Sequence, residues 1–395
     1  MGHEVKLFLC YVQAEFVLKK NSNLLWKGFI KGVTGMNEDV YKRLARVLDT
    51  LPNGFPPTES GLELDILKKI FTPDEADLFC DLKLKLEPLE TIAERTGRDK
   101  DILQEMLTSM SRRGEILGLD LGGTKLYRMV PWILGVYEYQ LPRMDRELAE
   151  LCEQYHNYFA PQFFGMKPHY MQVIPVEEEI SPEQEALTYL QASEIIEKGK
   201  SFAVAECVCK KEKSLLGKGC DKPREVCLGI APLEGIMEQF PHWGTPISKQ
   251  RAHELLKEAE DAGLVHLTLN SQQEHFFICN CCGCCCGVLR SINELGIFDS
   301  VNTWYYAQID PELCIMCGVC KDERCQVFAI EQGEESYLVD LQRCIGCGLC
   351  VSTCPSGAIS LVKKQDEQMD KTPVDEQDWF KQRGEQRGVE IDPYL

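Results

Sequence analysis

Residues 314–325 read CIMCGVCKDERC and residues 344–355 read CIGCGLCVSTCP, so one cysteine pattern occurs twice in the chain. Each copy has three cysteines separated by two residues. A fourth cysteine follows after four residues in the first copy and after three in the second. The flanks repeat as well: Ile309-Asp310 and Ala329-Ile330 correspond to Val339-Asp340 and Ala358-Ile359. We therefore expect two related halves that pack about a pseudo-twofold axis.

This spacing is suited to two [4Fe–4S] clusters. Three thiolates separated by two residues can reach three irons of one cube from a single loop, whereas the fourth lies too far along the chain and ligates the other cube. Cluster 1 is therefore assigned to Cys314, Cys317, Cys320 and Cys354. Cluster 2 is assigned to Cys344, Cys347, Cys350 and Cys325. Such centres carry electrons.

On these motifs, residues 306–364 resemble the bacterial dicluster ferredoxins, and the resemblance implies electron transfer. The first copy departs from the family pattern in two ways. It has one extra residue before Cys325, and Gln326 stands where the family has proline. Neither change removes a ligand, but both should alter the loop around cluster 2. We expect the two clusters to differ in reduction potential, which would give the transfer a direction.

Two other uses of cysteine fit the pattern less well. Structural zinc prefers paired knuckles set well apart, and disulfide frameworks are typical of short secreted chains. The apolar stretch 7–18 is interrupted by Gln13 and Glu15 and lacks a convincing cleavage site, so no secretory signal is predicted. No apolar run is long enough to cross a bilayer. We expect a cytoplasmic protein in an anaerobic cell.

The chain is strongly acidic. Its 43 lysines and arginines against 62 aspartates and glutamates give a formal charge of −19. Each cubane with its four thiolates would add about −2. Such a surface repels nucleic acid and favours docking to a redox partner protein with a basic surface.

A chain of 395 residues should hold several domains, and the pattern predicts an α+β multidomain protein. We expect a helical segment at 1–60, a winged-helix-like domain at 61–135, a cysteine-rich α+β module at 136–300, the pseudo-twofold dicluster ferredoxin at 301–364 and a charged tail at 365–395. The composition of the tail is typical of disorder. Its aromatic residues offer the alternative that it is held against a surface: Trp379, Phe380 and Tyr394.

The winged-helix expectation rests on the order of elements in residues 72–130. Thr72-Pro73-Asp74-Glu75 has the form of a capping box at a helix start. A helix is expected over 99–113, followed by a hairpin that turns at Gly122-Gly123. The 99–113 helix carries acidic as well as basic side chains, so protein docking or structural support is expected there rather than DNA binding.

The middle module holds ten further cysteines in two groups: Cys207, Cys209, Cys220 and Cys227, then Cys279, Cys281, Cys282, Cys284, Cys285 and Cys286. Adjacent side chains point apart, so one backbone segment cannot aim the second group at one metal. The expected strands 201–206 and 275–278 each lead into a group. If these strands are neighbours, the first group could close over the second. The isolated Cys10, Cys80 and Cys152 are expected to be ordinary buried thiols.

The ten cysteines predict one or two additional iron–sulfur clusters, with zinc or a thiol redox site as alternatives. The whole arrangement resembles an uncharacterised type of multi-cysteine ferredoxin-domain protein from anaerobic bacteria. The leading function hypothesis is an electron-transfer subunit or partner of a redox enzyme. Two alternatives are an oxidoreductase with an unusual catalytic Fe–S site near Cys279–Cys286, and an Fe–S redox-sensing regulator.

Overall fold

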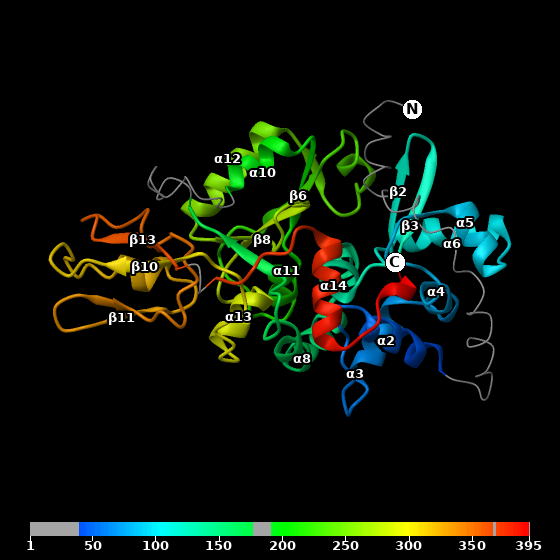
Figure 1. Cartoon of the computed structure of the whole chain (residues 1–395), viewed down its shortest axis with the longest axis horizontal. Helices are drawn as coiled ribbons and strands as arrows, with labels where there is room; N and C mark the ends of the chain where they lie inside the picture. Colours follow the sequence, from blue (N-terminus) through cyan, green and yellow to red (C-terminus); the bar gives the residue numbers. More distant parts are fainter. Residues whose placement is uncertain (1–38, 177–190, 366–368, 395) are drawn as a thin grey trace.

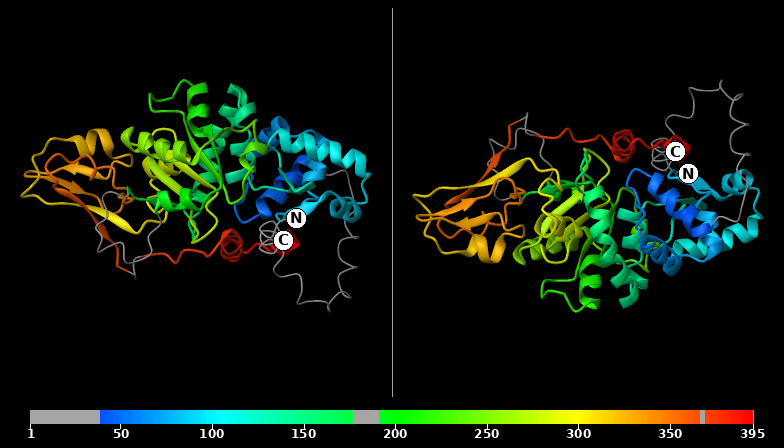
Figure 2. Two further views of the ribbon diagram at one scale, coloured as in Figure 1. Left: turned by 90° about the horizontal axis from the view of Figure 1, so that it is seen from above. Right: turned by 90° about the horizontal axis from the view of Figure 1, so that it is seen from below.

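The computed structural model describes residues 39–176, 191–365 and 369–394. These residues form three regions that follow one another along the longest axis of the molecule (Figures 1 and 2). A helical region lies at one end, a six-stranded sheet with its helices lies in the middle, and a cysteine-rich region with two small sheets lies at the other end. The chain therefore mixes helices and strands, as predicted. Within the described residues, no helix has the length and apolar character needed to cross a membrane.

The helical region contains α2 (Val40–Thr50), α3 (Leu62–Ile70), α4 (Pro73–Phe79), α5 (Leu89–Thr96) and α6 (Lys100–Arg112), with an antiparallel sheet of β1 (Glu87–Pro88), β3 (Thr124–Arg128) and β2 (Leu117–Leu121). The predicted capping box is present: the Thr72 hydroxyl accepts from the Glu75 N–H, and the Glu75 carboxylate accepts from the Thr72 N–H. Gly122 and Gly123 have positive φ and form the turn of the predicted hairpin. The winged-helix interpretation itself stays a prediction.

Four helices join this region to the middle of the molecule: α7 (Tyr137–Tyr139), α8 (Arg146–Phe163), α11 (Val208–Leu215) and α13 (Gly287–Asn293). Helix α8 contacts α3 on one side and α11 and α13 on the other. Tyr155 of α8 packs against Phe55, with ring centroids 5.0 Å apart, and against Trp132. One continuous apolar core therefore runs from the helical region into the middle module.

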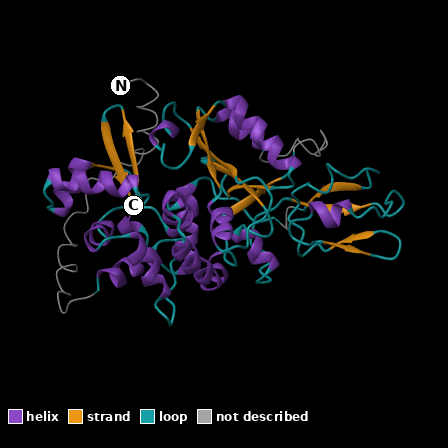
Figure 3. Ribbon diagram, turned by 180° about the vertical axis from the view of Figure 1, so that it is seen from behind, coloured by secondary structure: helices purple, strands orange, loops and turns teal. Residues whose placement is uncertain are grey.

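The middle sheet has six antiparallel strands in the order β4-β8-β9-β6-β5-β7. Strands are drawn in orange in Figure 3. They are β4 (Met171–Ile174), β5 (Ser201–Glu206), β6 (Glu225–Ala231), β7 (Thr245–Ile247), β8 (Val265–Leu269) and β9 (Phe277–Cys281). Helices α10 (Ala192–Lys198) and α12 (Lys249–Asp261) cover one face, and α8, α11 and α13 cover the other. Residues 181–184, Ser-Pro-Glu-Gln, have the form of a helix start and lie outside the described residues.

The strands that lead into the two cysteine groups are not direct neighbours. Strand β6 lies between β5 and β9 and pairs with both, so the condition under which the first group could close over the second is not met in that form. The segment around Cys227 is part of β6. Val226, Leu228 and Ile230 alternate and are buried against α10 and α12, which leaves Cys227 on the opposite face. Cys227 of the first group therefore lies on a strand that pairs with β9, which carries Cys279 and Cys281 of the second group.

The cysteine-rich region has two two-stranded antiparallel sheets. Strand β10 (Tyr305–Ile309) pairs with β13 (Ile359–Lys363), and β11 (Ile330–Gln332) pairs with β12 (Tyr337–Val339). Each flank of the first sequence repeat therefore pairs with a flank of the second: Ile309 lies opposite Ile359, and Ile330 lies opposite Val339. The dicluster ferredoxin fold itself stays a prediction.

The charged tail is an ordered part of the structure over residues 369–394. It runs back along the middle module and forms α14 (Glu376–Arg387) against the helical region (Figures 1 and 2). Trp379 and Arg383 are fully buried. The Trp379 indole N–H donates to the His169 carbonyl at 2.9 Å, and Arg383 donates to the carbonyls of Phe163 and Pro168. Disorder is therefore the wrong interpretation of this tail, and its aromatic residues hold it in place.

We expect Trp379→Ala to release α14, because the cavity left by a buried tryptophan costs about 3–5 kcal/mol. Amide hydrogen exchange of α14 should then speed up by roughly a hundredfold or more. The control Trp379→Phe keeps most of the packing and loses one hydrogen bond, so it should cost only about 1 kcal/mol. Unchanged protection of α14 in Trp379→Ala would contradict this account of the tail.

Candidate metal centres

The four cysteines assigned to cluster 1 lie together in the structure. They line one small cavity with apolar neighbours from both sequence repeats: Ile309, Ile315, Met316, Val319, Tyr337, Pro355, Ala358 and Ile359. Cys320 is electrostatically coupled to the other three thiols: Cys317, Cys314 and Cys354. Burial is the main reason why the pKa of Cys320 rises to about 11. Cys317 is exposed, so this set reaches the surface.

The four cysteines assigned to cluster 2 also lie together, in a more buried setting. The electrostatic interaction of Cys350 is strongest with Cys347 and weaker with Cys344 and Cys325. Burial raises the pKa of Cys347 to about 12. Backbone N–H groups donate to two of the sulfurs, from Ala307 to Cys344 at 3.4 Å and from Ala329 to Cys325 at 3.2 Å. Such donors favour the thiolate and tune the potential of a bound cluster. The assignment of both ligand sets stays a prediction.

The extra residue before Cys325 is absorbed by a π-helical turn over Cys320–Arg324, in which the Cys325 N–H donates to the Cys320 carbonyl at 3.0 Å. One-residue insertions of this kind are typical of π-turns. The turn directs Arg324 at the end of α12, where its guanidinium donates to the carbonyls of Glu260 (2.9 Å) and Asp261 (3.0 Å). The departure from the family pattern thus supplies a contact with the middle module.

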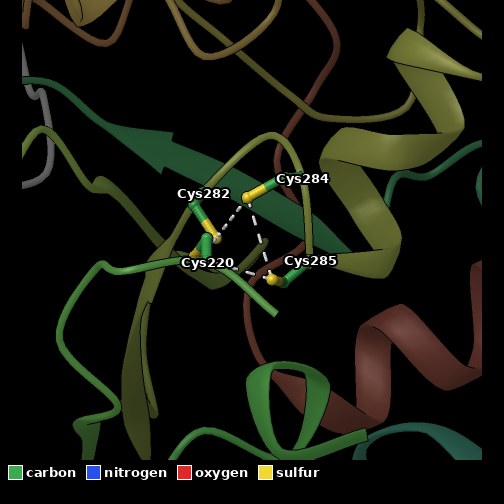
Figure 4. Close-up of side chains that lie close together, drawn as sticks. All are labelled: Cys220, Cys282, Cys284 and Cys285. Atoms are coloured by element: carbon green, nitrogen blue, oxygen red, sulfur yellow. Dashed lines mark hydrogen bonds between the residues drawn. The ribbon is translucent and has the colours of Figure 1, made fainter. Parts of the chain in front are cut away.

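The ten upstream cysteines separate into two sets. The first, called the tetrathiol set here, consists of Cys220, Cys282, Cys284 and Cys285 (Figure 4). Cys220 comes from the segment between α11 and β6, and the other three come from the turn that follows β9. All four sulfurs lie within 4.8 Å of one another. Individual Sγ–Sγ distances are 3.5 Å for Cys282–Cys284, 3.7 Å for Cys284–Cys285 and 3.8 Å for Cys220–Cys282 and Cys220–Cys285.

The second, six-thiol set consists of Cys207, Cys209, Cys227, Cys279, Cys281 and Cys286. A hydrogen bond with Cys207, and then burial, raises the pKa of Cys209. Hydrogen bonds with other members of the set likewise raise the pKa values of Cys279 and Cys281. A metal bound by Cys209, Cys279 and Cys281 would therefore have to displace their protons. Backbone N–H groups at the start of α13 donate to Cys209 and Cys286.

The isolated cysteines behave as ordinary thiols where the structure describes them. Cys152 is buried and Cys80 is half-buried. Burial raises the pKa of Cys80 to about 12, and it raises the pKa of Cys152 as well. Cys10 lies outside the described residues.

Residues 337–360, which include Cys344, Cys347, Cys350 and Cys354, match the family model described as a 4Fe-4S binding domain. The chain carries a 4Fe–4S domain. This name is used here for the cysteine-rich region 301–364, which contains the match. Relatives named as ferredoxins match the chain in part. Two uncharacterized ferredoxins of Methanocaldococcus jannaschii are 33% identical over 93 residues (22% of this chain and 52% of the relative) and 45% identical over 51 residues (12% and 33%). A ferredoxin of Hydrogenibacillus schlegelii, named "Ferredoxin 7Fe", is 46% identical over 37 residues (9% and 47%).

Each of these relatives matches only a small part of the chain, between 9% and 22% of it. The chain spans about half the length or less of each of the first curated relatives it matches. No solved structure matches it significantly. The matches therefore support 4Fe–4S binding and an iron–sulfur electron-transfer role, while the middle module must be interpreted from its own geometry.

The 4Fe–4S domain touches the middle module at the cysteine-rich turn. The Gly283 N–H donates to the Gln326 side-chain carbonyl at 3.1 Å. The Asn293 amide donates to the main-chain carbonyls of Gly283 (3.1 Å) and Gln326 (3.0 Å). A Cβ at position 283 would overlap the Gln326 carbonyl oxygen. Proline at position 326 would lack the accepting side chain, so this contact gives a physical reason for glutamine there.

The sequence did not reveal the roles of Gly283 and Asn293. A glycine inside a run of cysteines is a signal that backbones approach closely, but the partner of that glycine lies 43 residues away. Gln326 was recognised as a departure from the ferredoxin pattern, and its role becomes clear only when the two regions are seen together.

We expect Gly283→Ala to loosen the contact between the two regions by about 1–3 kcal/mol, because the new methyl group overlaps backbone. Hydrogen exchange of residues 325–328 should rise by roughly 5- to 150-fold. Gly287→Ala is a matched control next to the same cysteines, since its Cβ would meet only His156 at 3.4 Å. Equal protection in both variants would show that the contact does not hold the two regions together.

Proposed function

We propose that this chain is an iron–sulfur electron-transfer protein that serves as a subunit or partner of an anaerobic redox enzyme. It would hold two [4Fe–4S] clusters in the 4Fe–4S domain and at least one further Fe–S cluster in the middle module. When bound, such clusters exchange single electrons, and the protein sets their spacing, solvent exposure and hydrogen bonding. The chemistry of the donor set supports this proposal, because eight cysteines gather in two groups of four in the domain.

The observation that carries the proposal is the direct contact between two cysteine-bearing turns. Gly283 lies two residues after Cys281 of the six-thiol set, and Gln326 follows Cys325. Since adjacent Cα atoms are ~3.8 Å apart and the two backbones touch, Cys281 and Cys325 come within roughly 15 Å of each other. A chain that only carried a tethered ferredoxin would not need this contact.

The cysteines on both sides of the contact also border the same apolar core. Cys281 and Cys286 are buried members of the main apolar core, and Cys325, Cys344 and Cys347 pack against that same core. Apolar surroundings exclude water and limit the charge rearrangement that accompanies a change of redox state. The six-thiol set is therefore the preferred position for the further cluster.

The two clusters of the 4Fe–4S domain should differ in potential. Cys350 is buried and Cys325, Cys344 and Cys347 are half-buried, and the sulfurs of Cys325 and Cys344 accept backbone N–H bonds, whereas Cys317 of the other set is exposed. Exposure and hydrogen bonding to sulfur are main determinants of cluster potential. Cluster 1, whose ligand Cys317 is exposed, is the preferred site of electron exchange with a partner protein.

The helical region is proposed to dock a protein partner. In DNA-binding winged helices the hairpin and the recognition helix must be free. Here the hairpin residue Asp120 exchanges two main-chain hydrogen bonds with the Gln239 side chain, at 2.8 and 3.0 Å. Helix α6 also presents Asp101 and Glu105 beside its basic residues. The regulator alternative is therefore less well supported.

A catalytic site at Cys279–Cys286 is also less well supported, because Cys281, Cys282, Cys285 and Cys286 are buried.

Anaerobic purification of the full chain should give about twelve iron atoms, with a similar amount of acid-labile sulfide, if one further cubane is present. The double variant Cys279→Ser/Cys281→Ser should lose about four of each while it keeps the reduced EPR signals of the 4Fe–4S domain. Cys80→Ser is the matched control and should lose neither. About eight iron atoms in the unaltered chain would reject a cluster at the six-thiol set.

A further inference from the structure

The tetrathiol set is packed more tightly than the other cysteine groups of the described chain. Only two groups of three or more ligand side chains come within 4.8 Å of one another in residues 39–176, 191–365 and 369–394. One is the tetrathiol set. The other is His169 with Asp299 and Asp370, where Lys167 pairs with both carboxylates at 3.2 and 2.7 Å and supplies the cation. In the ferredoxin sets and the six-thiol set, no three sulfurs lie within 4.8 Å of one another.

This spacing distinguishes a single ion from a cluster. A tetrahedral ion with metal–sulfur bonds of ~2.3 Å has sulfur–sulfur edges of ~3.8 Å. Four of the six sulfur–sulfur edges of the tetrathiol set are 3.5–3.8 Å long. All six are below 4.8 Å. In a cubane each thiolate binds a different iron, so the sulfurs must stand much farther apart. The two ferredoxin sets of the same structure fit this difference, because no three of their sulfurs lie within 4.8 Å of one another.

The surroundings of the tetrathiol set are those of a closed site. Cys282 and Cys285 are buried, and only Cys284 is exposed. Four thiolates around a divalent ion leave a net charge of about −2. The positive charge of Lys210, a buried side chain, acts on Cys282 and offsets part of it. Four protein ligands with no open position are typical of structural sites rather than catalytic ones.

We propose that Cys220, Cys282, Cys284 and Cys285 bind one thiophilic metal ion, Zn²⁺ or Fe²⁺, in a closed tetrahedral site that contains no sulfide. Three of its ligands surround Gly283, and the fourth comes from a segment 62 residues earlier. The ion would fix the turn that presents Gly283 to Gln326 and would thereby set the orientation of the 4Fe–4S domain. The inference goes beyond the electron-transfer proposal and does not depend on it.

The test uses the full chain, purified anaerobically, and measures zinc, iron and acid-labile sulfide together. We expect one zinc per chain, or one iron beyond those matched by sulfide. Where the ion is zinc, X-ray absorption at the zinc edge should show four sulfur neighbours at ~2.3 Å and no neighbouring metal. This measurement needs no variant. Growth in zinc-supplemented and iron-supplemented media then distinguishes the two ions.

The variant Cys220→Ser should lose this ion, while its sulfide content and the reduced EPR signals of the 4Fe–4S domain stay unchanged. Cys80→Ser is the matched control and should keep the ion. Hydrogen exchange of residues 325–328 should rise in Cys220→Ser only, as in Gly283→Ala. Loss of about four sulfides per chain in Cys220→Ser would instead assign these thiols to a cluster. Absence of the additional ion in the unaltered chain would also overturn the proposal.

Discussion

Consecutive side chains of an extended strand point to opposite faces of a sheet, and this constraint decides what the ten upstream cysteines can do. Strand β9 sends Cys279 and Cys281 toward the face covered by α8 and α13. The turn that follows it places Cys282 and Cys285 in the opposite core, beneath α10 and α12. Six cysteines in eight residues thus serve two separate sets without competing for one metal. The central position of β9 gives both sets a rigid support.

The second organising feature is the way in which the 4Fe–4S domain departs from its family pattern. A standard ferredoxin loop has no reason to contact another protein region. Here the π-turn delivers Arg324 to the end of α12, where carbonyl groups carry partial negative charge and favour a cation. Gln326 then meets Gly283. Both unusual residues stand beside Cys325, so the changes that fix the domain are next to a predicted cluster ligand.

Local signals were sufficient for much of this molecule. The capping box at Thr72 and the glycine turn at 122–123 each depend on residues a few positions apart. The cysteine repeat indicated both ferredoxin sets for the same reason. Strand β6 is not among the strands expected from the sequence, although Val226, Leu228 and Ile230 alternate along it. The division of the upstream cysteines depends on contacts such as Cys220–Cys282, which no local pattern encodes.

The attachment of the 4Fe–4S domain to the middle module has a consequence for kinetics. Many electron carriers swing on a flexible linker, and the linker length then sets an effective concentration of the carrier at each docking site. Here Asn302 bonds to β4 and Gln326 bonds to Gly283, so the domain is held against the middle module at two places. Under the proposed function, electron exchange inside the molecule would occur at one constant separation. Its rate should not depend on solvent viscosity, whereas exchange with an outside partner should follow the frequency of diffusive encounters.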